Sequence, residues 1–173
     1  MTKQKRKSKA GFTLVEMLCA LVVMVLVSCL MAVGVRVAVK AYQTEVMHSE
    51  AQVLCSTIRT KVNDELRYAG SIYLTTNGEF SSFFSQSCGD KAYYFTNADG
   101  QVILTSGTGD HKILPAKSYP YGMKASVEIT NYNTTTRIFT VYVQVTESDG
   151  TTVLSDSTFQ VKQLNKPAIT NGS

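Results

Sequence analysis

The chain has 173 residues, of which 17 are basic and 13 acidic, giving a net charge of +4. Five of the basic residues precede Gly11, so the remaining 12 face 13 acidic residues, a net charge of −1. No basic patch is therefore expected outside this first segment, and nucleic acid is not an expected partner. The length predicts one domain with an appendage.

Residues 1–11 form a short basic segment, and a long apolar run follows it. Met17 to Val35 gives 19 consecutive uncharged residues, close to the ~20 that cross the hydrocarbon core of a membrane. Short basic flanks stay on the cytoplasmic side, so this run is expected to cross with its N-terminus inside and its C-terminal end outside. Glu16 is the only charged residue from Phe12 to Val35.

Three interpretations of this region compete. A secretory signal peptide has an apolar core of about 7–15 residues, which is shorter than the run here. A lipoprotein signal is the second, because Leu26-Val27-Ser28-Cys29 resembles a lipobox with Cys29 as the acylated residue. However, the apolar character continues to Val35, where a lipoprotein tether usually turns polar.

The third interpretation rests on residues 11–16, Gly-Phe-Thr-Leu-Val-Glu, between the basic segment and the apolar run. This stretch resembles the processing site of type IV prepilins and pseudopilins. The resemblance implies that a prepilin peptidase cuts after Gly11 and that the new N-terminal residue, Phe12, is N-methylated. It also implies that the helix is kept and built into a filament by an inner-membrane platform and an ATPase.

Glu16 needs its own explanation, because a carboxylate inside a bilayer costs at least ~2.5–3.5 kcal/mol near the centre and less near an interface. It lies in the first turn of the expected helix, where the helix dipole favours an anion. The resemblance implies an assembly role, in which Glu16 pairs with the N-terminal amine of a neighbouring subunit. A pair with the Phe12 amine of the same chain is the alternative, since a four-residue step places both on one helix face.

The helix is expected to continue beyond the membrane, because residues 36–69 contain neither proline nor glycine. Apolar residues recur at three- and four-residue steps, which predicts one stripe against a folded domain. Gly70 is expected to end the helix in the left-handed conformation. The predicted stripe consists of Val39, Tyr42, Val46, Val53 or Leu54, Ile58, Val62, Leu66 and Ala69.

Residues 71–173, called the head here, have the alternation of β-strands. A short strand is expected over 71–75, a turn at Asn77-Gly78, and a hairpin of 92–96 with 101–105 around a four-residue loop. The stretch 80–86 has no assignment, and residues up to Tyr121 are expected to be mainly loop. Residues 123–129, 139–146 and 153–161 predict a three-stranded antiparallel meander, and the residues after Lys162 a loose tail.

Cys55 and Cys88 could form a disulfide in an oxidising compartment, and two free thiols are the alternative. The sequence contains no convincing catalytic set, so neither an enzyme nor a cofactor or metal is expected.

These features predict an α+β, pilin-like fold, in which a long N-terminal helix packs on a small antiparallel β-sheet head. The expected parts are a leader over 1–11, a transmembrane and filament-core helix over 12–35, its amphipathic continuation over 36–70, and the head. The expected protein is a structural subunit of a type IV pilus (a fimbrium) or a type II secretion-like pseudopilus. It would sit in the cytoplasmic membrane and then in an extracytoplasmic filament of pilin subunits.

The lack of the usual helix proline favours a minor pilin or pseudopilin. A monomeric binding protein anchored in the membrane, by its helix or by lipid on Cys29, is the alternative.

Overall fold

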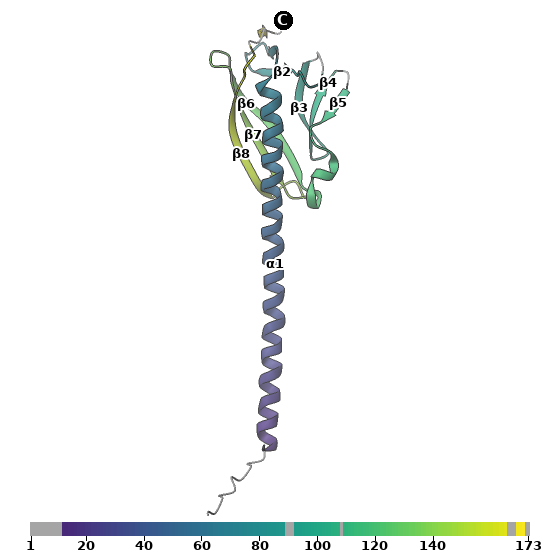
Figure 1. The fold of residues 1–173 in the computed structure, drawn as a ribbon, viewed down its shortest axis with the longest axis vertical. Helices are drawn as coiled ribbons and strands as arrows, with labels where there is room; N and C mark the ends of the chain where they lie inside the picture. The colour runs from purple at the N-terminus through teal and green to yellow at the C-terminus, as the bar shows by residue number, and fades with distance from the viewer. Residues whose placement is uncertain (1–11, 89–91, 108, 166–168, 172–173) are drawn as a thin grey trace, which may run out of the picture. The chain divides into compact units, whose positions relative to one another are not determined.

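The structure is a computed structural model that describes residues 12–88, 92–107, 109–165 and 169–171. The chain divides into two units, Met1–Thr44 and Glu45–Ser173, and each is described by itself. The fold is α+β, as the sequence predicts: one long helix, α1 (Leu14–Arg67), and antiparallel sheets (Figure 1).

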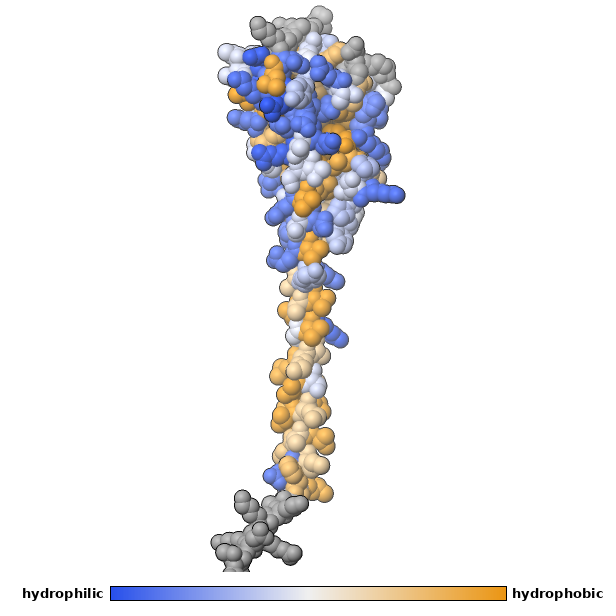
Figure 2. Space-filling model, viewed as in Figure 1, coloured by the Kyte–Doolittle hydropathy of each residue, from blue (hydrophilic) through white to orange (hydrophobic). Residues whose placement is uncertain are grey.

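The described part of the first unit is the N-terminal portion of α1. The helix is uninterrupted through Gly34, and its segment near the N-terminus is long and apolar enough to cross a membrane. Every described side chain of this unit is exposed. Apolar surface predominates on the visible face of the N-terminal half of α1 (Figure 2).

In the second unit the remainder of α1 packs against the sheets, as the stripe predicts. Its buried residues recur at three- and four-residue steps: Ala51, Leu54, Cys55, Ile58, Val62 and Leu66. The predicted stripe is wrong at its N-terminal end and at one ambiguous position. Val39 and Tyr42 are exposed, and the choice between Val53 and Leu54 falls to Leu54, because Val53 is 59% exposed.

The first sheet has six strands in the order β5-β4-β3-β2-β1-β9. All its pairings are antiparallel except that of β1 with β9, which is parallel. Two 3-10 turns, η1 (Ala116–Ser118) and η2 (Pro120–Gly122), follow β5. The strands are β1 (Ile72–Leu74), β2 (Phe80–Phe84), β3 (Ala92–Ala98), β4 (Gln101–Ser106), β5 (Gly109–Lys112) and β9 (Ile169–Asn171).

The strand at 71–75 and the turn at Asn77-Gly78 are confirmed, but other predictions for this region need correction. The β3–β4 loop has two residues, because Ala98 pairs with Gln101. Asp99 and Gly100 both have positive φ, 52° and 71°, as a tight hairpin turn of the I′ kind requires. The unassigned stretch 80–86 contains β2, and the expected loop contains β5.

The second sheet is the predicted meander of three antiparallel strands, β6 (Lys124–Asn133), β7 (Ile138–Thr146) and β8 (Val153–Lys162). One face is buried: Ala125, Val127, Phe139, Val141, Val143, Val145, Phe159 and Val161. These residues form a single core with the α1 stripe and with residues of the first sheet. Val153 departs from the predicted pattern, because a register shift near the start of β8 leaves it 45% exposed.

The C-terminal end of α1 is closed by residues that the sequence assigned to a loose tail. The fully buried Gln163 donates from Nε2 to the carbonyls of Ala69 and Gly70, both at 2.8 Å. The amide of Leu164 donates to the Arg67 carbonyl at 2.9 Å. Donors from residues 163 and 164 thus satisfy the carbonyl of the last helical residue, which a helix end leaves unpaired, and two carbonyls just beyond the helix.

Two predictions about this region are therefore wrong. The described part of the tail is ordered, with Gln163 and Leu164 against the helix end and β9 paired with β1. Gly70 does not adopt the left-handed conformation. A glycine fits here because it has no side chain: a Cβ at this position would lie 3.1 Å from Cδ1 and 3.2 Å from Cβ of Phe84.

Candidate assembly segment

The N-terminus of α1 is closed by a reciprocal pair of side chains. Thr13 precedes the first helical residue, and its Oγ1 accepts from the Glu16 amide at 3.3 Å. Glu16 Oε2 in turn accepts from the Thr13 amide at 3.1 Å and from Thr13 Oγ1 at 3.2 Å. This arrangement is a capping box, which satisfies two amides that a helix start leaves without partners.

Sequence reasoning missed this local role of Glu16, although the signal was present. A threonine followed three residues later by glutamate, directly before an apolar run, is the pattern of a capping box. Capping explains why a glutamate is stable at this position in a single chain. It leaves one oxygen over: among the described residues, no hydrogen bond engages Glu16 Oε1.

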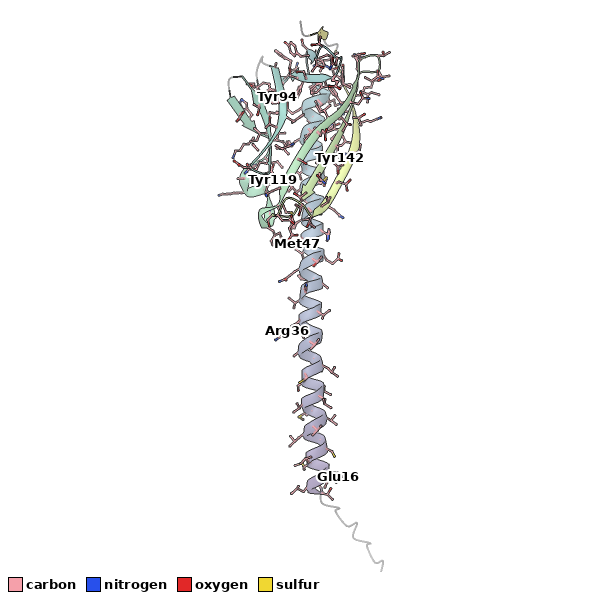
Figure 3. All side chains as sticks on the ribbon, turned by 180° about the vertical axis from the view of Figure 1, so that it is seen from behind. Glu16, Arg36, Met47, Tyr94, Tyr119 and Tyr142 are labelled. Atoms are coloured by element: carbon pink, nitrogen blue, oxygen red, sulfur yellow. The ribbon has the colours of Figure 1, made fainter. Side chains whose placement is uncertain are left out.

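The side chains of residues 12–35, which include Glu16, form an exposed and mainly apolar surface. Phe12 is 77% exposed, Leu14 82% and Leu30 72%, and the label in Figure 3 marks Glu16 in the first turn of α1. Soluble monomers rarely expose contiguous apolar patches larger than a few hundred Å². A surface of this kind is covered by lipid or by other protein.

The predicted site residues are widely distributed. Gly11 lies outside the described residues, whereas Phe12 and Glu16 lie at the start of α1. Cys55 and Cys88 are both free thiols, so the structure contains no disulfide between them. Cys55 is buried in the α1 stripe, and its burial raises the pKa of the thiol, with a smaller opposing effect from a hydrogen bond to Ser155.

Cys88 has different neighbours, near the end of β2. Its amide donates to Ser85 Oγ at 3.4 Å, and its carbonyl accepts from the Tyr93 hydroxyl at 3.0 Å. Ser85 also donates to Glu65 Oε2 at 2.8 Å. This network attaches the segment after β2 to α1 ten residues beyond Cys55, which accounts for the separation of the two thiols.

The long apolar N-terminal helix, capped by Thr13 and Glu16, and its packing on antiparallel sheets define a pilin-like class of structure. Residues 6–35 match the family model described as the prokaryotic N-terminal methylation motif. The chain therefore carries the type IV prepilin-type motif over these residues. No curated protein and no solved structure matches this chain.

Proposed function

We propose that the protein is a minor pilin or pseudopilin, a structural subunit of a type IV pilus or a type II secretion-like pseudopilus. Prepilin peptidase cleaves it after Gly11, and Phe12 is then N-methylated. The subunit waits in the cytoplasmic membrane with its head outside, and a platform protein and an ATPase move it into a filament of pilin subunits.

One observation carries this proposal: the methylation motif covers an apolar helical segment whose described side chains, over residues 12–35, are all exposed in the isolated chain. A helix used only as a membrane anchor needs no processing site of this kind. In the proposed cycle, lipid covers residues 12–35 before assembly and neighbouring helices cover them afterwards. The same surface therefore serves both states.

We assign the assembly contact to Glu16. Cleavage after Gly11 creates a cationic amine on Phe12, and the amine of one subunit binds Glu16 of the next. Capping and pairing are compatible, because the capping box uses Oε2 and leaves Oε1 to accept a further donor. A carboxylate already oriented by its own helix loses less side-chain freedom on pairing than an unrestrained one.

Mass spectrometry of the N-terminus tests the proposal. The mature chain purified from membranes is expected to begin with N-methylated Phe12, and Gly11→Leu is expected to retain the leader. A chain that begins at an acylated Cys29 would instead establish the lipid-anchored alternative. Cys29 lies within the uninterrupted α1, so that outcome would remove the first part of the helix.

A further inference from the structure

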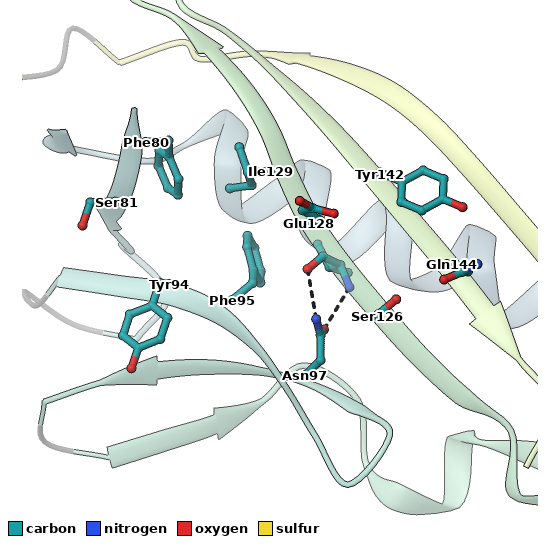
Figure 4. Close-up of a pocket in the computed structure, with 11 residues that line it drawn as sticks. Phe80, Ser81, Tyr94, Phe95, Asn97, Ser126, Glu128, Ile129, Tyr142 and Gln144 are labelled. Carbon is teal, nitrogen blue, oxygen red and sulfur yellow. Dashed lines mark hydrogen bonds between the residues drawn. The ribbon is translucent and has the colours of Figure 1, made fainter. Parts of the chain in front are cut away.

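The outer edge of β6 is only partly covered by the first sheet. The amide of Ala125 donates to the carbonyl of Gly100 at 2.8 Å. Two residues further along, the side chain of Asn97 takes the place of a neighbouring strand. The Val127 amide donates to Asn97 Oδ1 at 2.9 Å, and Asn97 Nδ2 donates to the Val127 carbonyl at 3.4 Å (Figure 4).

The next outward-facing residue on this edge is Ile129. Alternate residues of an antiparallel strand direct their main-chain groups to the same side, so Ile129 follows Ala125 and Val127. In the part of the chain that the structure describes, its N–H and C=O make no hydrogen bond to the first sheet. A bulge between Ile129 and Asn131 then ends the alternation. The edge is thus open at Ile129, and an open edge can accept another strand.

A groove runs along this open edge. Two adjoining cavities of about 400 and 340 Å³ share Phe80, Glu128 and Ile129 in their walls. Phe80 and Phe95 come from the first sheet, opposite Ile129 of β6 (Figure 4). The groove therefore combines an apolar side, suited to side chains, with the free main-chain groups of a strand.

The groove is also acidic. Among the residues that the structure describes, Glu79 and Glu128 are the two carboxylates in the walls of the two cavities, and no lysine, arginine or histidine lines them. Both carboxylates belong to residues exposed to solvent. A ligand that enters the groove therefore meets two negative charges, which favours a positively charged ligand.

We propose that this groove binds an extended, positively charged peptide segment of a partner protein, which adds to β6 as a further strand. The main chain of the peptide pairs with Ile129, and its lysine or arginine side chains lie near Glu79 and Glu128. Its apolar side chains contact Phe80 and Phe95. Strand addition of this kind takes affinity from main-chain hydrogen bonds and specificity from alternate side chains.

Movement of the Asn97 side chain could expose a second residue of β6 for pairing with the peptide. This side chain occupies the Val127 main-chain groups through two hydrogen bonds without joining the strands. If it rotates away, a peptide can pair with Val127 as well as Ile129. A sugar chain is the competing ligand, because aromatic and amide groups line the groove. However, only a peptide has a main chain that can pair with the free edge of β6, so the free edge favours a peptide over a sugar.

Fluorescence anisotropy tests the proposal with the full chain in uncharged detergent micelles. The probe is a labelled heptapeptide of alternating lysine and valine, and the comparison probe replaces each lysine with glutamate. Saturable binding of the lysine probe is expected, at least ~10-fold tighter than that of the glutamate probe. Glu128→Lys should abolish this preference, because the new lysine and Glu79 leave the groove without net charge. The matched reversal Glu50→Lys, on the exposed face of α1, should leave the preference within about twofold.

Ile129→Pro tests the strand pairing, because it removes the outward N–H, and proline is tolerated at strand edges. Ile129→Pro should lower the affinity for the lysine probe ~10-fold or more, whereas Ile129→Val, which keeps the N–H, should leave that affinity unchanged. Thermal unfolding of each variant checks its fold, and the comparison of the two probes on the unaltered chain needs no variant. Equal binding of both probes, no saturable binding, or full binding by a folded Ile129→Pro would overturn the proposal. So would saturable binding of a chitin oligosaccharide without binding of the lysine probe.

Discussion

Glu16 has a local role in the structure, and our proposal gives the same side chain an intermolecular one. Its Oε2 closes the helix N-terminus with Thr13, and its negative charge lies at the positive end of the helix dipole. Truncation of Glu16 removes both the hydrogen bonds and the charge. An alanine variant alone therefore cannot separate helix capping from charge pairing.

Glutamine separates them, because it can complete a capping box but carries no charge. We expect Glu16→Gln to keep the helix content of the full chain and to lose filament incorporation as fully as Glu16→Ala. Thr13→Ala is the matched control: it should cost the cap about 1 kcal/mol while it keeps the carboxylate and incorporation. Circular dichroism and immunoblots of sheared filaments measure the two effects. Normal assembly of Glu16→Gln would show that capping is the only role of this residue.

The two thiols of the second unit should differ in reactivity. The thiolate is the reactive form, and burial raises the pKa of Cys55 and limits access to it. We expect iodoacetamide to label Cys55 at least ~10-fold more slowly than the half-buried Cys88 at pH 8. Because the pKa is raised, the Cys55 rate should continue to rise at higher pH.

Peptide mass spectrometry after timed quenching gives both rates. In urea, where burial is lost, the rates should converge, and this serves as the control. Equal rates in the folded chain would contradict the buried environment of Cys55.

At the scale of elements, the junction of α1 with the first sheet depends on the absence of a side chain at position 70. The Gly70 amide donates to the Phe84 carbonyl at 2.8 Å, and the Phe84 amide donates to the Ser71 carbonyl at 2.9 Å. These bonds bring the end of the helix and β2 so close that the Phe84 side chain fills the space next to Gly70. The glycine therefore sets the distance between the two elements.

Gly70→Ala should accordingly destabilise the protein by about 1–3 kcal/mol, because the new methyl group overpacks against Phe84. Gly107→Ala is the control: among the described residues, no atom is recorded within 4 Å of its added Cβ, so the change should be neutral or slightly stabilising. Urea unfolding of the full chain in micelles, followed by circular dichroism, measures both. A stability for Gly70→Ala equal to that of Gly107→Ala would refute the close packing.

The regular elements were predictable wherever one periodicity held over many residues. The α1 stripe from Leu54 to Leu66 and the meander of β6, β7 and β8 follow from apolar spacing alone. The first sheet was harder, because β5 and β9 are too short to establish a period. The strand over Phe80–Phe84 was not predicted for another reason. Serines interrupt its aromatic residues, so the stretch resembles a loop as much as a strand.

At the scale of the whole molecule, the least predictable feature is the contact of the C-terminal residues with the end of α1. Gln163 is buried and polar, and its position in the sequence, after the last long strand, gives no sign of either property. It also accepts from the Tyr132 hydroxyl at 3.0 Å through Oε1. Its environment comes from segments 31 and 94 residues away along the chain, which local patterns cannot identify.

Gln163→Ala should therefore have an effect much larger than its place near the C-terminus indicates. The carbonyls of Ala69 and Gly70 lose the Nε2 donor, and the Tyr132 hydroxyl loses its acceptor, at a cost of about 2–3 kcal/mol. Gln160→Ala, at an exposed position on β8, should change the free energy of unfolding by no more than about 0.5 kcal/mol. Urea titrations of both variants provide the comparison, and equal midpoints would show that Gln163 does not hold the helix end.

This closure of α1 also orders events during biosynthesis. The ribosome releases α1 first, whereas Gln163 follows Gly70 by 93 residues and emerges later. Until then the carbonyls of Arg67, Ala69 and Gly70 lack the partners that they have in the finished fold. A nascent chain therefore has the apolar segment of α1 in full before the end of the same helix acquires these hydrogen-bond partners.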